Sequence, residues 1–171
     1  MSVTPLAQIP IGVVVERRRA DSPWIDFTWR PTAVLPGTPE TSAWTQLSAD
    51  GDATLFYAGA TEIAFYASET GNYRDNLVSG TPALWVALRP TGVEPPYDLV
   101  AVTADPAEGE GYTQNGDHLV EAVPMPEAIR ALLEAFVAEH HVERPFYKRK
   151  RDRADPEALA RRVPAPKGKG Q

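Results

Sequence analysis

Five consecutive residues near the middle of the chain bring an amide, a phenol, a guanidinium and a carboxylate together: Asn72, Tyr73, Arg74, Asp75 and Asn76. Groups of these types bind small ligands through directed hydrogen bonds. Asn and Asp side chains also hydrogen-bond to the backbone of their own loop, and we favour this structural interpretation. The ligand hypothesis predicts a concave pocket bounded by this segment, with Arg74 facing a bound anion.

A second set of chemically active residues forms a basic segment further along the chain. Residues 144–171 hold ten Lys and Arg against three Asp and Glu, a net of +7, whereas residues 1–143 hold seven against twenty, a net of −13. Such segregation is typical of an interaction segment, so we predict that the basic segment binds a partner protein. The candidate partner-binding residues are Arg144, Phe146, Tyr147, Lys148, Arg149, Lys150 and Arg151.

Three interpretations of this basic segment stay open. It can dock on an acidic protein surface, including the acidic part of this chain. It can bind nucleic acid, with its cations on phosphates and with Phe146 and Tyr147 stacked on bases. The acidic remainder of the chain would repel a phosphate backbone, so nucleic acid is the less favoured partner. The segment can also be a solvated tail that Phe146 and Tyr147 anchor to the core.

Adjacent histidines suggest a metal site only at first sight. His140 and His141 are followed by Glu143, but neighbouring helical residues point about 100° apart and cannot both face one ion without distortion. Histidines in a last helical turn are explained by the negative end of the helix dipole. We therefore predict no metal site.

The remaining motifs for catalysis or cofactor binding are weak. Gly109, Gly111 and Gly116 lack the spacing of a dinucleotide fingerprint, and no lysine follows them. No Gly-x-Ser-x-Gly motif is present. The absence of cysteine excludes thiolate zinc sites, cysteine-held iron–sulfur clusters and thiol nucleophiles. We predict no catalytic residue and no cofactor, and we favour a binding protein over an enzyme.

Seventeen prolines divide the first two thirds of the chain into short segments, which favours strands over helices. Alternation supports this, most clearly where Ile25, Phe27 and Trp29 share a face. Trp24 and Trp85 fall on the polar phase of their strands and are candidates for an exposed partner patch. The expected strands cover 11–17, 24–30 with a continuation at 32–35, 44–48, 54–57, 62–67, 83–89, 97–103 and 119–123; the segment 69–79 is expected as a loop or one short helical turn, and 105–116 as an exposed loop.

A helical period replaces the strand pattern near residue 126 and predicts an amphipathic helix over about 126–141. The chain is thus expected to hold a single β-rich domain at 1–143 and a basic tail at 144–171, with a short helix at 155–162 as an option and a disordered end. The predicted fold class is α+β and mostly β: an antiparallel sheet or partly open barrel of about seven strands, with one C-terminal amphipathic helix packed on it.

Targeting signals are not recognisable in the sequence. No basic region precedes the apolar residues 11–15, so we expect no secretory signal. No segment approaches the ~20 apolar residues that a membrane helix needs. We expect a cytoplasmic protein without a membrane partner.

Four strings together carry a family resemblance: PIGVVVERRRADSPWIDFTWRPTAVLPG, ETGNYRDNLVSGTPALWVALRP, PPYDLVAVTADPAEGEGY and EHHVERPFYKRKRDRADPEALARR. From about residue 10 to 162 the chain resembles an uncharacterised proteobacterial family of unknown function, whose genes tend to lie beside those of molybdenum-dependent formate dehydrogenases. The resemblance implies an accessory or maturation role for such an oxidoreductase, and it supplies no catalytic residues.

The favoured hypothesis is a non-enzymatic accessory or adaptor protein, possessing a basic segment that engages an acidic surface of an oxidoreductase apoprotein or of its maturation machinery. Without cysteine, the chain cannot carry sulfur as a persulfide, so it would assist by binding. The alternative is a small-ligand-binding module or enzyme with a site around 72–76. Nucleic-acid binding through the basic segment is the third hypothesis.

Overall fold

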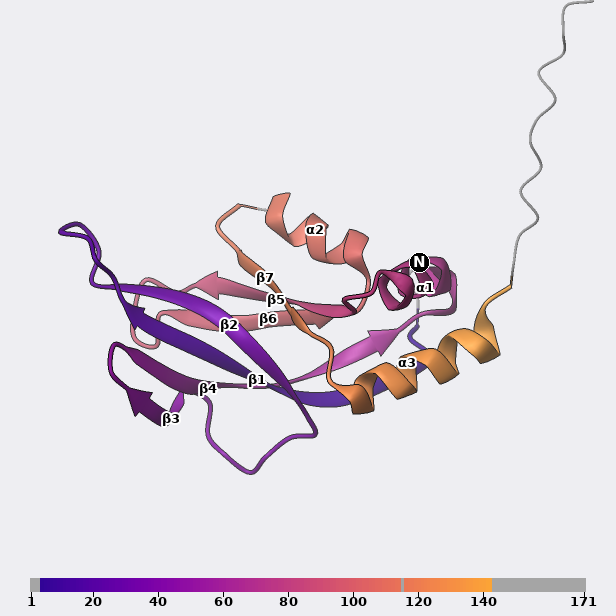
Figure 1. Ribbon diagram of the computed structural model, residues 1–171, viewed down its shortest axis with the longest axis horizontal. Coiled ribbons are helices and arrows are strands. Elements are labelled where there is room, and N and C mark those ends of the chain that lie inside the picture. Colours follow the sequence, from indigo (N-terminus) through magenta and orange to yellow (C-terminus); the bar gives the residue numbers. More distant parts are fainter. Residues whose placement is uncertain (1–3, 115, 143–171) are drawn as a thin grey trace, which may run out of the picture. The chain divides into compact units, whose positions relative to one another are not determined.

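The computed structural model describes residues 4–114 and 116–142, and over these residues the chain forms seven strands and three α-helices (Figure 1). In chain order they are β1 (Ala7–Arg19), β2 (Phe27–Pro36), β3 (Thr45–Asp50), β4 (Ala53–Phe65), a short 3₁₀ helix (Ala67–Glu69), α1 (Thr70–Val78), β5 (Ala83–Pro90), β6 (Tyr97–Thr103), α2 (Pro106–Gln114), β7 (Leu119–Pro124) and α3 (Glu127–His140). All of them belong to one compact unit, Met1–His141, and Val142–Gln171 form a second unit. The short helix considered at 155–162 lies outside the described residues.

Two antiparallel sheets form the body of the first unit. The four-stranded sheet has the order β2-β1-β4-β3 and the three-stranded sheet the order β6-β5-β7. Their central strands supply the core, because the apolar run from Ile11 to Val15 in β1 and the side chains of Leu84, Val86 and Leu88 in β5 are buried.

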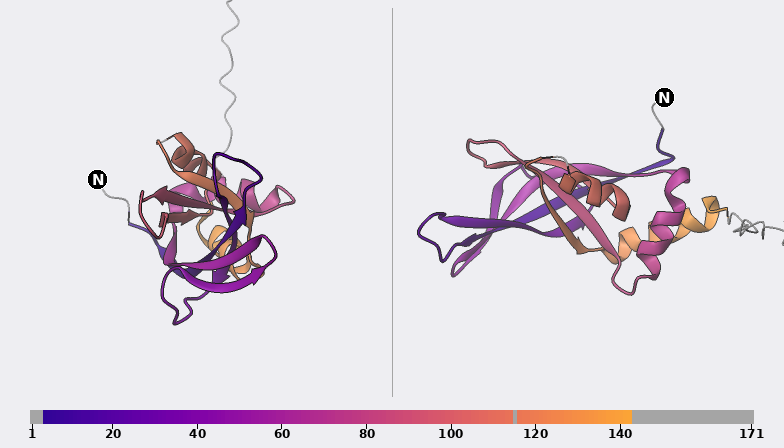
Figure 2. Two further views of the ribbon diagram at one scale, coloured as in Figure 1. Left: turned by 90° about the vertical axis from the view of Figure 1, so that its left-hand side faces the viewer. Right: turned by 90° about the horizontal axis from the view of Figure 1, so that it is seen from above.

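The two sheets face each other and enclose one hydrophobic core (Figure 2). β4 contacts β6 and β2 contacts β7, but the strand ladders do not continue from one sheet to the other in the described residues. The mostly β, antiparallel prediction is confirmed. The single sheet or barrel is corrected to two packed sheets, since the sequence pattern fixes which face of a strand is apolar but not which strands pair.

Two expected strand pairs are continuous strands in the structure. Residues 27–30 and 32–35 of the expected segments lie in one strand, β2, which runs through Pro31 opposite Val15 at a register shift, whereas residues 24–26 belong to the loop before it. Proline is tolerated there because β2 is an edge strand of its sheet.

Residues 54–57 and 62–65 likewise lie in one strand, β4, which ends at Phe65. Gly59 lies beside a register shift between β4 and β1 and has a φ of 132°. This backbone conformation favours glycine, so Gly59 marks a bulge within a strand rather than a turn between strands.

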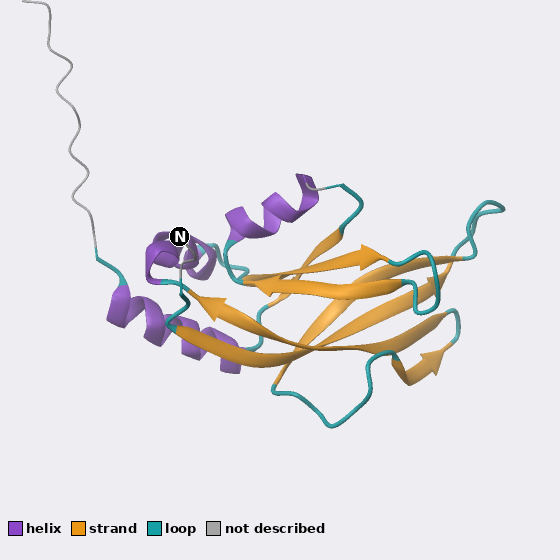
Figure 3. Ribbon diagram, turned by 180° about the vertical axis from the view of Figure 1, so that it is seen from behind, coloured by secondary structure: helices purple, strands orange, loops and turns teal. Residues whose placement is uncertain are grey.

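The helix α3 begins and ends within the predicted range 126–141. Its apolar face packs on the core through Ile129, Leu133 and Phe136. Figure 3 shows α1 and α3 at one end of the strands, with the loops β1–β2 and β3–β4 at the other end. We call this second end the hairpin end.

The prediction of a loop over 105–116 is wrong, because residues 106–114 form α2. Asp105 caps this helix by accepting a hydrogen bond from the backbone N–H of Ala107 at 2.9 Å. Gly109 counts against a helix in sequence terms, yet it is the residue that fits: a Cβ there would overlap Trp85 in β5. The close contact with β5 therefore explains why a glycine, which in the sequence indicated a loop, lies within this helix.

The segment 69–79 forms the two-turn helix α1 rather than a loop or a single turn. Its sequence lacks an amphipathic pattern, because two of its three buried residues, Thr70 and Asn76, are polar and only Tyr73 is aromatic. Tertiary hydrogen bonds and ring contacts of Tyr73 and Asn76 hold the helix in place.

In the described part of the chain, none of the helices combines the length and the apolar character needed to cross a membrane.

Candidate functional site

The helix α1 distributes the five residues of the predicted polar site over different faces. Tyr73 and Asn76 are buried, Asn72 is half-buried, and Arg74 and Asp75 are exposed. Successive residues of an α-helix are turned by about 100°, so five in a row cannot face one ligand. The structure therefore does not bring the five side chains together at one surface.

Asn76 connects α1 to the strands of the second sheet. Its Nδ2 donates hydrogen bonds to the carbonyl oxygens of Ala83 at 2.8 Å and Ala104 at 3.0 Å. Its Oδ1 accepts a hydrogen bond from the backbone N–H of Ala83 at 3.0 Å. With its hydrogen-bonding capacity used by the fold, this side chain has a structural role.

Tyr73 lies in the core between two phenylalanine rings, with centroid distances of 5.7 Å to Phe65 and 6.2 Å to Phe136. Its hydroxyl accepts a hydrogen bond from the backbone N–H of Tyr66 at 3.0 Å. Burial raises the pKa of Tyr73 to about 12; nearby carboxylates add to the rise, and the bond from Tyr66 opposes it. The phenol stays protonated at neutral pH and is not placed to act as a base.

The exposed side of α1 meets the end of α3. Nη1 of Arg74 lies 3.5 Å from Nε2 of His141, and Nδ1 of the same imidazole lies 3.1 Å from Oγ1 of Thr70. His140 packs instead on the ring of Phe136, with centroids 4.5 Å apart. The two histidines thus have different neighbours. Among residues 4–114 and 116–142, no three His, Cys, Asp or Glu side chains form a group that could hold a metal.

An open cleft of about 480 Å³ lies between the start of α1 and the start of α2. Of the five predicted residues, Asn72 lines it, together with Glu69, Asp105 and Glu108. Nδ2 of Asn72 donates hydrogen bonds to Oε2 of Glu69 at 3.2 Å and to Oδ1 of Asp105 at 3.0 Å. Three carboxylates favour a cationic or hydrogen-bond-donating ligand and disfavour the anion of the ligand hypothesis.

The carboxylates of this cleft also hold α2 in place. Oε2 of Glu108 accepts a hydrogen bond from Oγ1 of Thr103 at 2.9 Å, and Oε1 accepts one from the hydroxyl of Tyr112 at 3.3 Å. Burial, followed by the charge of Glu108 and this hydrogen bond, raises the pKa of Tyr112. Asp105 caps the same helix. Each of these two acids thus has partners within the fold.

A second group of side chains, which no sequence motif indicated, lies at the hairpin end. The guanidinium carbon of Arg17 lies over the rings of Phe27, Phe56 and Trp29, at 4.4, 5.1 and 5.9 Å from their centroids. Trp29 also contacts two further rings, each with a centroid distance of 6.1 Å. We call this set the arginine–aromatic cluster: Arg17, Phe27, Trp29, Trp44, Phe56 and Tyr97.

The alternation of β1 explains why an arginine lies among these rings. Arg17 follows Val15 on the core face of the strand, opposite Trp29 of β2. On the outer face, Glu16 forms ion pairs with Arg18 at 3.2 Å and Arg30 at 3.8 Å. Arg17 makes no hydrogen bond or ion pair with any residue in the described ranges, so aromatic rings are its partners there.

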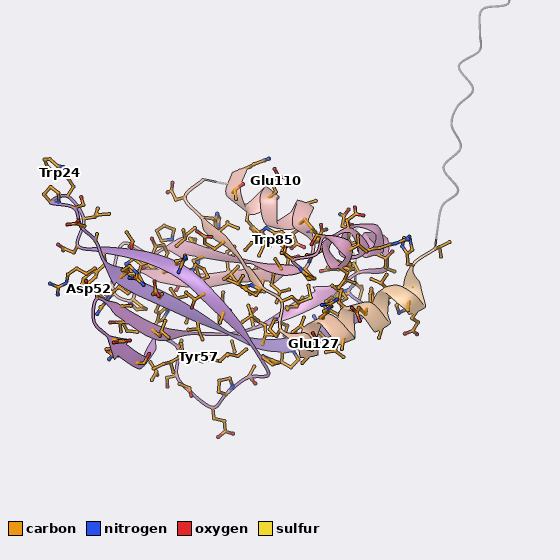
Figure 4. The ribbon with its side chains drawn as sticks, in the orientation of Figure 1. Trp24, Asp52, Tyr57, Trp85, Glu110 and Glu127 are labelled. Carbon is orange, nitrogen blue, oxygen red and sulfur yellow. The ribbon has the colours of Figure 1, made fainter. Side chains whose placement is uncertain are left out.

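Large apolar side chains are exposed next to this cluster. Trp24 is 89% exposed, Ile25 52% and Phe27 36%. Figure 4 shows Trp24 at the tip of the loop that joins β1 to β2. Trp24 is thus exposed, but because it lies in a loop and not because of a strand phase, whereas Trp85 is half-buried against Gly109. We call the arginine–aromatic cluster, together with Trp24 and Ile25, the hairpin surface.

The basic segment predicted to bind a partner, Arg144 to Arg151, lies outside the described residues. Its role stays a prediction.

Comparison with known proteins places the chain in a family. A sequence model of the DUF3305 family, described as a protein of unknown function, matches residues 10–150, so the chain belongs to this family. No curated protein and no solved structure matches the chain.

Proposed function

We propose that this protein is a non-enzymatic adaptor and that the hairpin surface is where it binds a partner protein. The observation that carries this proposal is the exposure of Trp24, Ile25 and Phe27 within four residues of one another. Adjacent apolar side chains exposed in this way are typical of protein–protein contacts. Tryptophan and arginine are also the residues that most often dominate the energy of such contacts.

The basic segment at 144–151 is the second contact in this proposal. The basic segment carries positive charge, whereas residues 1–143 have a net charge of −13. This positive charge complements an acidic surface on the partner. Contacts of this kind weaken as salt screens them, whereas burial of Trp24 would be less sensitive to salt. The two contacts can therefore be separated by their dependence on ionic strength.

The partner that we propose is a molybdenum-dependent formate dehydrogenase-type oxidoreductase or its maturation machinery. The support for this identity is the resemblance noted in the sequence, to a family whose genes tend to lie beside those of such enzymes. Because the chain has no cysteine, the assistance would consist of binding the partner or its cofactor rather than of sulfur transfer.

A pull-down from native extract at low salt, analysed by mass spectrometry, tests the proposal. The full chain is compared with Trp24→Ala and with a matched control, Leu132→Ala, which truncates another exposed apolar side chain on α3. We expect the control to recover the same oxidoreductase or maturation factor as the full chain and Trp24→Ala to lose most of it. Equal recovery by both variants would place the partner elsewhere.

The same experiment with a chain that ends at Glu143 examines the basic segment. Reduced recovery at low salt, but not at high salt, is expected if the basic segment adds an electrostatic contact. Unchanged recovery at every salt concentration would remove residues 144–151 from the binding site.

A small-ligand-binding module is the second candidate function, and the cleft beside Asn72 favours it. The carboxylates around that cleft restrict the ligand to a cation or a hydrogen-bond donor. An NMR titration with spermidine tests this, with Asn72→Ala compared to Asp75→Ala as the exposed control on the same helix. Shifts that do not saturate, or that are equal in both variants, would exclude the cleft.

Nucleic-acid binding through the basic segment is the third candidate. It requires affinity for a single-stranded oligonucleotide that falls steeply with salt and depends on Phe146 or Tyr147. Fluorescence anisotropy with a labelled oligonucleotide measures both properties.

A further inference from the structure

We infer that Arg17 is an anion-binding residue that receives a single carboxylate group from an otherwise apolar segment of the partner protein. This inference rests on the proposed function, because it names the chemistry of the partner at the hairpin surface. The features that carry it are the partial burial of Arg17, its lack of a hydrogen-bond acceptor in the described ranges and the aromatic rings around it.

The arginines with ion pairs in the described ranges show what Arg17 lacks. Arg18 and Arg30 share Glu16, Arg89 lies 3.4 Å from Asp98, and Arg130 lies 3.0 Å from Glu134. Arg18, Arg30 and Arg89 are exposed to water, whereas Arg130 is half-buried, as Arg17 is. Arg17 is half-buried and, among residues 4–114 and 116–142, its interactions are with aromatic rings.

Aromatic rings satisfy part of the chemistry of a guanidinium group. Their π faces attract its charge, but they offer no lone pair to its five N–H donors. A carboxylate supplies two oxygens in the geometry of the guanidinium fork and forms two parallel charge-assisted hydrogen bonds. An incoming carboxylate would therefore provide what the rings around Arg17 cannot.

The rings also hold the binding group in a fixed position. Trp29 contacts Phe56 at a centroid distance of 5.8 Å and Trp44 at 6.1 Å, and these rings come from different strands and loops of the first sheet. A side chain that is ordered before binding loses less conformational entropy when the ligand arrives. The surrounding apolar surface also weakens screening by water, which strengthens the ion pair.

The charges on the nearby loops indicate a single carboxylate rather than a polyanion. A nucleic-acid backbone would place a row of phosphates across this end of the molecule, and acidic side chains in its loops would repel it. A peptide segment with one carboxylate among apolar residues can place that carboxylate at Arg17 and its apolar residues against Trp24 and Ile25. The acidic residues in question are Asp21, Asp26, Asp50 and Asp52.

The direct test uses a small probe on the full chain. The probe is 3-phenylpropionate, which joins a carboxylate to an apolar ring, and the matched neutral probe is 3-phenylpropionamide. NMR follows the Nε–H signal of Arg17 and the indole N–H signal of Trp29. We expect saturable shifts with the carboxylate and at least about tenfold weaker binding of the amide, since a charged hydrogen bond is lost. Equal binding of the two probes would overturn the inference.

Substitution of the arginine separates geometry from charge. Arg17→Lys keeps the positive charge but lacks the planar fork, so it should bind 3-phenylpropionate about tenfold more weakly or worse. Arg19→Lys is the control, because Arg19 lies on the same face of β1 but is exposed. The amide spectrum of each variant checks that it is folded. Binding by Arg17→Lys as tight as that by Arg19→Lys would exclude Arg17 as the receptor.

The pull-down distinguishes a failure of this inference from a failure of the proposed function. Loss of the partner with Trp24→Ala but not with Arg17→Lys would keep the hairpin surface and refute the carboxylate contact. Retention by both variants would refute both. Two other occupants would also overturn it: a second copy of this chain, if size-exclusion chromatography shows a dimer that Arg17→Lys abolishes, or nucleic acid, if a single-stranded oligonucleotide shifts the Arg17 signal.

Discussion

Replacing Asn76 by alanine tests whether the polar residues of α1 serve folding or ligand binding. The side chain of Asn76 is 4% exposed and makes three hydrogen bonds, two to carbonyl oxygens of Ala83 and Ala104 and one from the N–H of Ala83. Asn76→Ala removes all three and leaves these backbone groups without them in a place that water enters poorly. We therefore expect a loss of stability.

The magnitude follows from the number of bonds. A hydrogen bond within a protein contributes about 1 kcal/mol net, so three of them predict a loss of about 3 kcal/mol in the free energy of unfolding. Asp75→Ala is the matched control, because Asp75 is the preceding residue of the same helix and is exposed. A change within about 0.5 kcal/mol is expected for it.

Urea unfolding followed by tryptophan fluorescence measures both variants. With a slope near 2 kcal/mol per molar, the midpoint of Asn76→Ala should fall by about 1.5 M at unchanged slope. Asn76→Asp should also lose stability at neutral pH, because its buried carboxylate faces carbonyl oxygens. Part of this loss should be recovered on acidification, since burial raises the carboxyl pKa and protonation removes the charge. A loss below about 1 kcal/mol for Asn76→Ala, or one equal to that of Asp75→Ala, would refute the structural role.

Three further predictions concern buried groups. Gly109→Ala should lower the free energy of unfolding by about 1–3 kcal/mol, because its Cβ would overlap Trp85, whereas Gly111→Ala, on the same helix with open space around it, should raise it by about 0.5–1 kcal/mol. Thermal unfolding measures the pair, and equal effects would contradict the packing argument. Tyr57→Phe removes a buried hydroxyl without a hydrogen-bond partner in the described ranges and should leave urea stability unchanged or raise it by about 1 kcal/mol; a clear loss would reveal a missed partner. The pKa of Tyr73 is raised from 10.0 to about 12 in the folded protein, so its protonated phenol stabilises the fold fully below pH 10.0, and this stabilisation is lost as pH rises toward about 12. Urea unfolding at several pH values in this range should show a falling free energy of unfolding, and the fall should be smaller in Tyr73→Phe. Parallel pH profiles of the two proteins would disprove the shift.

The strand content could be predicted from the sequence because alternation and proline spacing are local signals. The expected strand 97–103 coincides with β6, and the expected helix 126–141 contains α3. Pairing between strands is a long-range property that the single sequence does not carry. This explains why one sheet or barrel was expected and two sheets are present.

The helices α1 and α2 lacked a sequence signal for a physical reason. Neither has a continuous apolar face, and each is held by a few specific contacts with the strands. Asn76 bonds to backbone groups that are distant in sequence, and Gly109 fits against Trp85. Local propensity disfavours glycine in a helix by about 1 kcal/mol, and such tertiary contacts override it.

The candidate sites differ in a property that residue types do not reveal. The segment from Asn72 to Asn76 combines more types of polar group than the other candidates, yet Tyr73 and Asn76 form hydrogen bonds with backbone groups of the protein itself. Arg17, by contrast, resembles an ordinary charged residue at the end of a strand. What distinguishes Arg17 is visible only from the strand register. The neighbouring carboxylate, Glu16, lies on the other face of β1 and pairs there with Arg18 and Arg30, so it is not available to Arg17.

A binding group must have interactions left to offer, because one already satisfied by the protein gains little from a ligand. The carboxylates of the acidic cleft accept hydrogen bonds from Asn72, Thr103 and Tyr112, so a ligand there would compete with the fold. The guanidinium of Arg17 would gain hydrogen bonds without giving up any with the described residues. By this criterion the hairpin surface is the better-supported binding site, and its loss of function on Arg17→Lys should occur without the loss of stability expected for Asn76→Ala.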